Sequence, residues 1–594
     1  MDTWFDINPE RWDREQKTLK ETNIDFQIDL EAKARGILHL YVTITKESKL
    51  VVSEKFLPIK LTATFPSAYP YFRPEVCAPD LSLPRHQNIV AKNLCLLPRE
   101  TVNWLPETTL ANYITEQLPK VLTEGEITDP DVLMFNNDEQ AEPVSVYYPN
   151  EVGASIIFNP EPFDLLLKSS NKKAEQLGTV NIGIPEAATA PTRMAVLESF
   201  DNSKQSLGKL PDAVNDIFLP RITGSIYRLQ DRPPNANASE DYKWLISLLD
   251  EQKEKLLKPR NSITLKKGST VENVIGLTFP EEHSPGRFSS GWLFIVVISA
   301  PTQKIIQKRI VPFKEKRLYY ANANRINTNE LSFRIASLKP LADKKIAVFG
   351  LGALGAPSVL GFAKNGIKEL RIIDYDIVNA GTTVRWPLGI KSAGMFKTQA
   401  LKKFIDENYP FTNVLNYQFK VGGIDTPDNQ TLRNILDDVS LIYDATAEIG
   451  VNHFLSREAQ NRKIPYICIF GTPGVWGGVA IRVVPNITEG CWMCFQYLLT
   501  DGMIPSPPTN RDGNIQAAGC GDISFTGASF ELDNIVSTGV RLAVGTLCSF
   551  EAGYPNLNPD VGVLSLVDEY GNPKFPTWSG HKLTKHPNCP YCNT

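Results

Sequence analysis

Apolar and polar residues alternate in two stretches near the start of the chain, at residues 36–45 and 59–65. A period of two is typical of half-buried β-strands. A proline-rich passage follows at residues 66–84, and residues 110–122 repeat apolar positions at helical spacing. This order predicts an α+β domain over residues 1–150 whose central part is largely loop.

A different pattern begins near residue 345, where short apolar runs alternate with helical stretches. The runs predict strands and the stretches after them predict helices: strands at 345–349, 369–373, 440–443 and 465–469, and helices at 329–338, 395–407 and 452–462. Strand–helix alternation favours a parallel sheet. We therefore expect residues 325–594 to form an α/β, Rossmann-like domain with a doubly wound sheet.

Residues 151–324 give the weakest pattern. A strand at 292–298, a polar loop at 231–239 and a helix at 240–257 predict a middle α+β domain. Its sequence contains no recognisable catalytic constellation, so we interpret it as a linker or partner-docking domain.

The composition indicates in which cellular compartment the protein acts and which classes of partner it is expected to bind. Hydrophobic residues make up 42% of the chain and charged residues 22%, with a net charge of −4, as in soluble globular proteins. No basic bias indicates a nucleic-acid or anionic-membrane partner. The start of the chain carries acids without an apolar core, and the apolar run at 292–300 is too short to span a bilayer. We expect a cytoplasmic protein whose 9 cysteines serve thiol chemistry or bind metal.

A glycine-rich turn links a predicted strand to a predicted helix: Gly350, Gly352 and Gly355 lie between them. Glycines let the backbone approach a phosphate, and the helix N-terminus supplies N–H donors. Asp374 follows at the tip of the next strand, 19 residues beyond Gly355, where it can bind a ribose hydroxyl. Taken alone, this motif also fits a nicotinamide dehydrogenase, or a turn kept only for close packing.

Further charged residues favour triphosphate chemistry. Asp376 lies two residues after Asp374, Arg385 and Lys397 follow, and Asp444 ends a later strand. The two cations suit the phosphates of ATP, and the strand-end carboxylate of Asp444 suits Mg²⁺ (magnesium). A hydride-transfer site needs none of these groups.

With these residues, the region from about 325 to 592 resembles the ThiF-type adenylating domain shared by ubiquitin-activating enzymes and the bacterial activators of sulfur-carrier proteins. The resemblance implies that Asp374 binds the ATP ribose, that Arg385 and Lys397 contact phosphates, and that Asp444 binds magnesium. It also implies an upstream arginine, for which Arg325 is a candidate, and a homodimer through this domain.

The last part of this region contains two CxxC pairs. The first pair is Cys491 and Cys494, and the second pair, at the end of the region, is Cys589 and Cys592. Four thiolates in paired knuckles suit a closed, structural Zn²⁺ site, with a redox CxxC as the alternative. The family resemblance also implies a zinc here. Cys520 lies among small residues in Ala-Ala-Gly-Cys-Gly-Asp, and resembles the catalytic cysteine of ubiquitin-activating enzymes, which accepts the acyl group as a thioester.

Cys95 is a second candidate thiol. The segment from His86 through Gln87 and Asn88 to Cys95, with Trp104 beyond it, resembles the active site of ubiquitin-conjugating enzymes, over residues 20–125. That family has proline at the position of Gln87. The resemblance implies that Asn88 stabilises the oxyanion when an amine attacks the thioester.

An activating and a conjugating region on one chain resemble the fused activating–conjugating enzyme of bacterial CBASS anti-phage operons. The resemblance implies that the enzyme activates the C-terminus of a protein, a cyclic-oligonucleotide synthase. The activated acyl group then passes to Cys520, from Cys520 to Cys95, and finally to an acceptor protein or small amine. Two alternatives stay open: a sulfurtransferase-type activator that stops at the adenylate or a persulfide, and a degenerate, non-catalytic scaffold.

Overall fold

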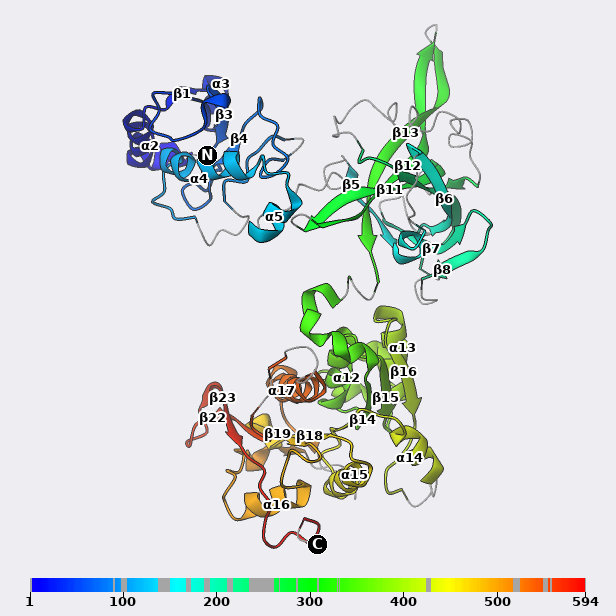
Figure 1. The fold of residues 1–594 in the computed structure, drawn as a ribbon. Helices are drawn as coiled ribbons and strands as arrows, with labels where there is room; N and C mark the ends of the chain where they lie inside the picture. The colour runs from blue at the N-terminus through cyan, green and yellow to red at the C-terminus, as the bar shows by residue number, and fades with distance from the viewer. Residues whose placement is uncertain are drawn as a thin grey trace. The chain divides into compact units, whose positions relative to one another are not determined.

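The computed structural model describes residues 3–88, 91–97, 104–136, 150–166, 172–185, 193–210, 217–233, 261–265, 268–284, 287–306, 309–327, 330, 332–423, 429–515, 524–548, 554–555 and 558–592. The chain divides into two compact units, the first ending at Arg325 and the second continuing from Ile326 (Figure 1). The first unit holds the N-terminal region and the middle region.

The N-terminal region is an antiparallel sheet with helices. Its strands follow the order β1-β2-β3-β4 in an antiparallel meander. The elements are α1 (Trp4–Ile7), α2 (Pro9–Glu21), β1 (Asp25–Ile28), α3 (Leu30–Ala34), β2 (His39–Ile44), β3 (Ile59–Thr64), β4 (Glu75–Cys77), α4 (Leu110–Glu124) and α5 (Pro130–Asn136). The alternation predicted β2 and β3, and the helical spacing predicted α4. The helix α2 was not predicted, although Asn8 caps it and Pro9 opens it, as helix starts favour.

The core of this region follows from the alternation. Leu40, Val42 and Ile44 of β2 point to one face of the sheet and are at most 1% exposed. They belong to the same buried cluster as Leu118 and Leu122 of α4. The long passage between β4 and α4 therefore runs over a packed sheet–helix core, which gives its loops a fixed support.

The middle region is a β-barrel. Its strands are hydrogen-bonded in the order β11-β12-β13-β5-β7-β6-β9, and β9 also pairs with β11, so the sheet closes on itself. The strands are β5 (Asn150–Phe158), β6 (Ala174–Gly183), β7 (Arg193–Asp201), β9 (Arg221–Leu229), β11 (Thr270–Ser284), β12 (Arg287–Ile306) and β13 (Arg309–Arg325). The short strands β8 (Ser206–Lys209) and β10 (Ile263–Thr264) pair with β7 and β11.

Aromatic side chains fill the barrel. Phe158, Trp292 and Phe294 are at most 2% exposed, and the rings of Phe158 and Trp292 lie 4.5 Å apart. The predicted strand at 292–298 is the central part of β12. Among the described residues, the regular structure of this region is β apart from the short helix α7 (Glu161–Asp164), and the α+β class stays a prediction. The predicted loop at 231–239 lies mostly, and the predicted helix at 240–257 wholly, outside the described residues.

The second unit is built on a mixed sheet of order β16-β15-β14-β17-β18-β19-β22-β23. The strands from β16 to β18 are parallel, and the pairs beyond β18 are antiparallel. They are β14 (Lys345–Phe349), β15 (Glu369–Ile373), β16 (Asn413–Tyr417), β17 (Leu441–Asp444), β18 (Tyr466–Gly471), β19 (Gly477–Val483), β22 (Val561–Val567) and β23 (Pro573–His581). A short hairpin, β20 (Asn514–Ile515) with β21 (Ser524–Phe525), stands apart from this sheet.

Both faces of the parallel strands are buried. Along β14, Ile346 and Val348 join one apolar cluster, whereas Ala347 and Phe349 join another on the opposite face. The first cluster includes α12 (Gly355–Lys364), α13 (Lys397–Asn408) and α17 (Ser529–Cys548). The second includes α14 (Asn429–Leu436), α15 (Ile449–Arg462) and α16 (Trp492–Thr500). Helices on both faces explain why these strands read as continuous apolar runs.

One predicted helix of this unit differs from the structure in both its type and its ends. The helical stretch expected at 329–338 is a 3₁₀ helix, η4 (Phe333–Asp343), which carries Pro340 and a break at Ile335. The other predicted strands and helices of this unit fall within three residues of the observed ends. Among the described helices, none combines the length and the apolar composition that crossing a lipid bilayer requires.

Candidate functional site

A pocket of about 510 Å³ opens where β14, β15 and β17 end. The carboxyl ends of neighbouring parallel strands meet at this edge of the sheet, which is where ligands bind in open α/β folds. Its wall includes Gly350, Gly352, Asp374, Asp376 and Lys397. The structure thus brings together five of the residues that the sequence predicted for a nucleotide site.

The three glycines have different roles. Gly350 has φ +79°, and a Cβ there would lie 2.8 Å from the backbone of Thr446. A Cβ on Gly355 would lie 1.8 Å from the carbonyl oxygen of Gly350. These two positions require glycine for the turn itself. At Gly352 a Cβ would meet nothing within 4 Å, so this glycine leaves open space at the pocket wall.

Asp374 holds the glycine turn in place. Its Oδ2 accepts the N–H of Leu351 at 2.7 Å, and its Oδ1 accepts the N–H of Asp376 at 2.8 Å. The Lys397 Nζ lies 2.9 Å from Asp376 Oδ2 and 3.5 Å from Asp374 Oδ2. A cation and two carboxylates are therefore fixed beside the turn, with Lys397 anchored at the first position of α13.

Arg385 contacts the hairpin at the pocket rim. Its Nη1 donates to the Phe525 carbonyl oxygen at 2.6 Å and its Nη2 to Ser524 Oγ at 2.9 Å, with the guanidinium above the Phe525 ring. Burial lowers the pKa of Arg385. Ser524 and Phe525 line the pocket. A phosphate contact by Arg385 stays a prediction, and in this geometry the side chain fixes β21.

Asp444 is enclosed. It is 0% exposed, and its oxygens accept hydrogen bonds from the Thr446 N–H and hydroxyl, the Asn452 amide and the Tyr466 hydroxyl. Burial raises its pKa. A magnesium ligand needs lone pairs that face the metal, so the predicted magnesium role of Asp444 does not fit this arrangement. Its observed contacts tie the end of β17 to α15.

Another carboxylate lines the pocket instead. Glu448 is exposed and lies just before α15, and the described residues include no ion pair for it. By contrast, Asp374 and Asp376 are both paired with Lys397. The sequence gives no signal for Glu448, because this residue follows the end of β17 by four residues instead of standing at it.

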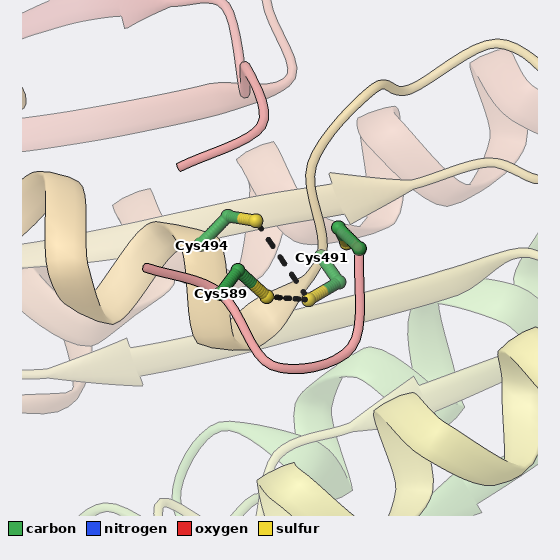
Figure 2. Close-up of side chains that lie close together, drawn as sticks. Cys491, Cys494 and Cys589 are labelled. Carbon is green, nitrogen blue, oxygen red and sulfur yellow. Dashed lines mark hydrogen bonds between the residues drawn. The ribbon is translucent and has the colours of Figure 1, made fainter. Parts of the chain in front are cut away.

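Four cysteines form a compact cluster near the end of the chain. The Sγ atoms of Cys491, Cys494, Cys589 and Cys592 all lie within 4.8 Å of one another. Figure 2 shows the first three with their sulfur atoms directed toward each other, at 3.9 Å for Cys491–Cys494 and 3.6 Å for Cys491–Cys589. Zn–S bonds of about 2.3 Å put tetrahedral thiolates at such separations. The cluster fits a zinc ion whose four coordination positions are all taken by cysteine thiolates.

The N-terminal candidate site lies in the passage between β4 and α4. Cys95 is half-buried, and its N–H donates to the His86 carbonyl oxygen at 2.7 Å. Asn88 N–H donates to the Asn93 carbonyl oxygen at 2.9 Å, and its Oδ1 accepts the Ala91 N–H at 2.9 Å. The structure therefore places the Asn88 turn and Cys95 on adjacent, hydrogen-bonded segments. Because Asn88 Oδ1 accepts the Ala91 N–H, Nδ2 is the side-chain atom of Asn88 that can donate a hydrogen bond.

Gln87 stiffens this loop where the conjugating family has proline. It is 1% exposed, its Nε2 donates to the Ala78 carbonyl oxygen at 2.9 Å, and its Oε1 accepts the Leu83 N–H at 2.8 Å. A buried side-chain amide with both ends bound constrains the backbone around it. Side-chain hydrogen bonds of Gln87 therefore hold this turn in place.

For two other predicted residues, a role at the pocket stays a prediction. Cys520 lies outside the described residues, between the paired strands β20 and β21. Arg325 ends β13 of the barrel, and its Nη2 donates to the Ser290 carbonyl oxygen at 2.8 Å. The described contact of Arg325 is therefore with the first unit.

The unit with the pocket and the cysteine cluster can be compared with known proteins. Residues 326–554 match the ThiF family. The y4oA protein of Sinorhizobium fredii, described as uncharacterized, is 27% identical over 556 residues, which is 89% of either chain. That match extends far outside the ThiF region, so the N-terminal and middle regions occur together with it in another protein.

The ThiF region is also related to adenylyltransferases. The adenylyltransferase and sulfurtransferase UBA4 of Saccharomyces cerevisiae is 27% identical over 175 residues, which is 29% of this chain and 36% of UBA4. The structure of E. coli MccB with ATP matches 45% of this chain and 75% of MccB, at 15% identity and a TM-score of 0.33. The part of the chain that matches the ThiF family is therefore also similar to the adenylyltransferase UBA4 over part of its length.

Proposed function

We propose that this protein uses ATP to activate the C-terminal carboxylate of a protein substrate as an acyl adenylate. The observation that carries the proposal is the pocket in the ThiF region, where the open space at Gly352 adjoins Asp374 and Lys397. Phosphates would lie against the glycine turn and α12, and the Lys397 ammonium would compensate their charge. The substrate carboxylate attacks the α-phosphate and pyrophosphate leaves.

The acyl group then passes along two cysteines. Cys520 attacks the adenylate carbonyl, the new S–C bond replaces the bond to phosphate, and AMP leaves. The Cys95 thiolate attacks this thioester and releases the Cys520 thiolate. An acceptor amine finally displaces Cys95, and Asn88 Nδ2 donates to the oxyanion that forms. Cys95 next to the Asn88 turn supports the last step.

The magnesium that accompanies ATP would be held by Glu448, because Asp444 is fully hydrogen-bonded and enclosed. When bound, the ion would offset charge on the triphosphate. The four cysteines would hold a structural zinc, whose part is to fix the C-terminal segment against α16.

The resemblance to fused CBASS enzymes leads us to propose a cyclic-oligonucleotide synthase as the activated protein, in anti-phage defence. The acceptor is then a protein or a small amine. We further propose a cytoplasmic homodimer through residues 325–592, which light scattering at assay concentration would test: a monomer there would contradict it.

An ordered set of variants tests the relay. Lys397→Ala should slow ATP–pyrophosphate exchange and the formation of every thioester to the same extent. Cys520→Ala should keep exchange and lose all thioesters, whereas Cys95→Ala should keep a reductant-sensitive thioester on Cys520 and form no conjugate. Cys77→Ala, also a half-buried thiol of the N-terminal region, is the matched control and should conjugate normally. The relay is wrong if Cys95→Ala conjugates at the unmodified rate, or if Cys520→Ala still charges Cys95.

A second candidate is a sulfur-carrier activator, favoured by the relation to UBA4, which is named as an adenylyltransferase and sulfurtransferase. In that case Cys95 has no part in turnover. Incubation with a sulfur donor and ATP would then yield a substrate thiocarboxylate in the Cys95→Ala variant as in the unmodified protein.

A further inference from the structure

The surroundings of Cys95 contain a charged group, Arg73, to which neither resemblance assigns a role. Arg73 lies in the loop between β3 and β4, in Tyr-Phe-Arg-Pro. Its Nη1 donates to the carbonyl oxygen of Leu97, two residues beyond Cys95. The guanidinium is therefore bound directly to the segment that carries the thiol.

Tyr113 supports this arginine from α4. The Tyr113 side chain is 3% exposed and its hydroxyl is hydrogen-bonded to Arg73. Its ring meets Trp104 edge-on at 5.4 Å, and Trp104 Nε1 donates to the Pro70 carbonyl oxygen at 2.7 Å. The packed aromatic pair fixes the hydroxyl, so that Arg73 is held between α4 and the Cys95 segment.

The charged groups around Tyr113 act on its hydroxyl. Burial raises the pKa of Tyr113 to about 12, with Arg73 lowering it and the charge of Cys95 raising it. Tyr113 is thus neutral at physiological pH. The hydrogen bond from Arg73 to Leu97 places the guanidinium two residues along the chain from Cys95. On the other side, His86 pairs with Glu124, at 3.8 Å between Nε2 and Oε2.

We propose that Arg73, held by Tyr113 and by the Leu97 carbonyl, is a positioning residue that prepares the Cys95 thiol for acyl transfer. The inference rests on the proposed role of Cys95. A nearby cation favours the thiolate, which is the form that attacks. In the transfer, the Cys95 sulfur forms a bond to the acyl carbon and the bond to the Cys520 sulfur breaks. The proton that Cys95 loses to solvent is balanced by one that the Cys520 thiolate takes up.

The pH dependence of Cys95 alkylation tests this inference on the full chain. Iodoacetamide labelling at pH 6 to 10, followed peptide by peptide with mass spectrometry, reports Cys95 separately from the other thiols. Arg73→Met should shift the Cys95 profile to higher pH and reduce labelling at pH 7 about tenfold, since one pKa unit is a factor of ten in thiolate. At high pH the rates should converge. Arg73→Lys keeps a charge and should shift the profile less.

Matched variants separate charge from folding. Arg14→Met removes an exposed arginine from α2 and should leave the Cys95 profile unchanged. Tyr113→Phe keeps the ring packing but frees Arg73, and should give a partial shift. The inference is overturned if Arg73→Met leaves the profile unchanged, if it slows labelling equally at every pH, or if His86→Gln alone produces the shift. Because no acyl donor is present, labelling gives its answer even if Cys95 never carries a thioester.

Discussion

The pocket at the strand ends of the second unit and the Cys95 site of the first differ in how they are assembled. In the pocket, the glycine turn and Asp374 follow consecutive strands, and local hydrogen bonds join them. At the Cys95 site, the residues come from two loops and a helix: Arg73, the Asn88 turn with Cys95, and Tyr113. The first site is set by the sheet, and the second by contacts between loops.

The difference also concerns charge. In the pocket, Lys397 faces two carboxylates, so that incoming phosphates must compete with Asp374 and Asp376. At Cys95, Arg73 meets a neutral phenol and a carbonyl oxygen. The two sites therefore surround their cations with different groups.

The largest effect is expected at the cysteine cluster. Cys589→Ser removes one of four ligands, and structural zinc sites contribute several kcal/mol to folding. We expect the second unit to lose about one zinc per chain and to melt at a lower temperature. Metal analysis with calorimetry measures both, and Cys77→Ser serves as the control. Unmodified protein that contains no zinc after purification without chelator would contradict the zinc site.

Lys397→Ala should come next. Among the described residues of the pocket wall, Lys397 is the one lysine whose ammonium group pairs with Asp374. Its removal should slow ATP–pyrophosphate exchange by about 10²–10³-fold, because no ammonium group would then compensate the phosphate charge there. Lys403→Ala, an exposed lysine on the same helix α13, should leave exchange unchanged. Iodoacetamide labelling of Cys95 should be the same in both variants. Equal exchange in the two lysine variants would remove Lys397 from the proposal.

Asp444→Ala should destabilise the second unit by roughly 3 kcal/mol, because buried donors on Thr446, Asn452 and Tyr466 would lose their acceptor. Urea unfolding measures this loss. Glu448→Gln, an exposed change, should keep stability and weaken exchange by raising the magnesium requirement. The assignment to Glu448 fails if this variant exchanges normally at limiting magnesium.

Asn88→Ala should have the smallest effect of the four. The variant should load Cys95 normally and slow only the transfer to an amine, by about 10²-fold if the amide is an oxyanion donor. Single-turnover discharge of the Cys95 thioester to an added amine measures this step. Asn93→Ala keeps the backbone hydrogen bond to the Asn88 turn and is the matched control. Slow loading with normal discharge would point to a structural role for Asn88.

Several residues chosen from the sequence line one pocket, because the signals that mark them are local. Gly350, Asp374 and Lys397 each stand at the end of a strand or the start of a helix, and parallel pairing brings such ends together. The role of Asp444 could not be predicted, because the four donors that enclose it include Asn452 and Tyr466 from other elements. Burial and partners of a carboxylate depend on tertiary packing.

Loop contacts explain what was missed at the first site. Nothing in the order of residues indicates that Arg73 reaches the carbonyl beyond Cys95, or that Gln87 takes the place of a proline by binding Ala78 and Leu83. The barrel was missed for a related reason. Its strands pair across long separations, as when Arg325 of β13 lies opposite Phe158 of β5, and such pairing leaves no periodic signal beyond that of single strands.

This pairing of β5 with β13 has a consequence for biogenesis. The two ends of the middle region are neighbours in the ring, so the ring can close only after the ribosome has released residue 325. The preceding α+β region has its own buried core and can fold earlier. Long-range β pairing is slow and leaves strand edges open while it is incomplete. Expression of a fragment that stops before β13 should therefore give inclusion bodies, whereas one that ends at Arg325 contains every strand of the ring.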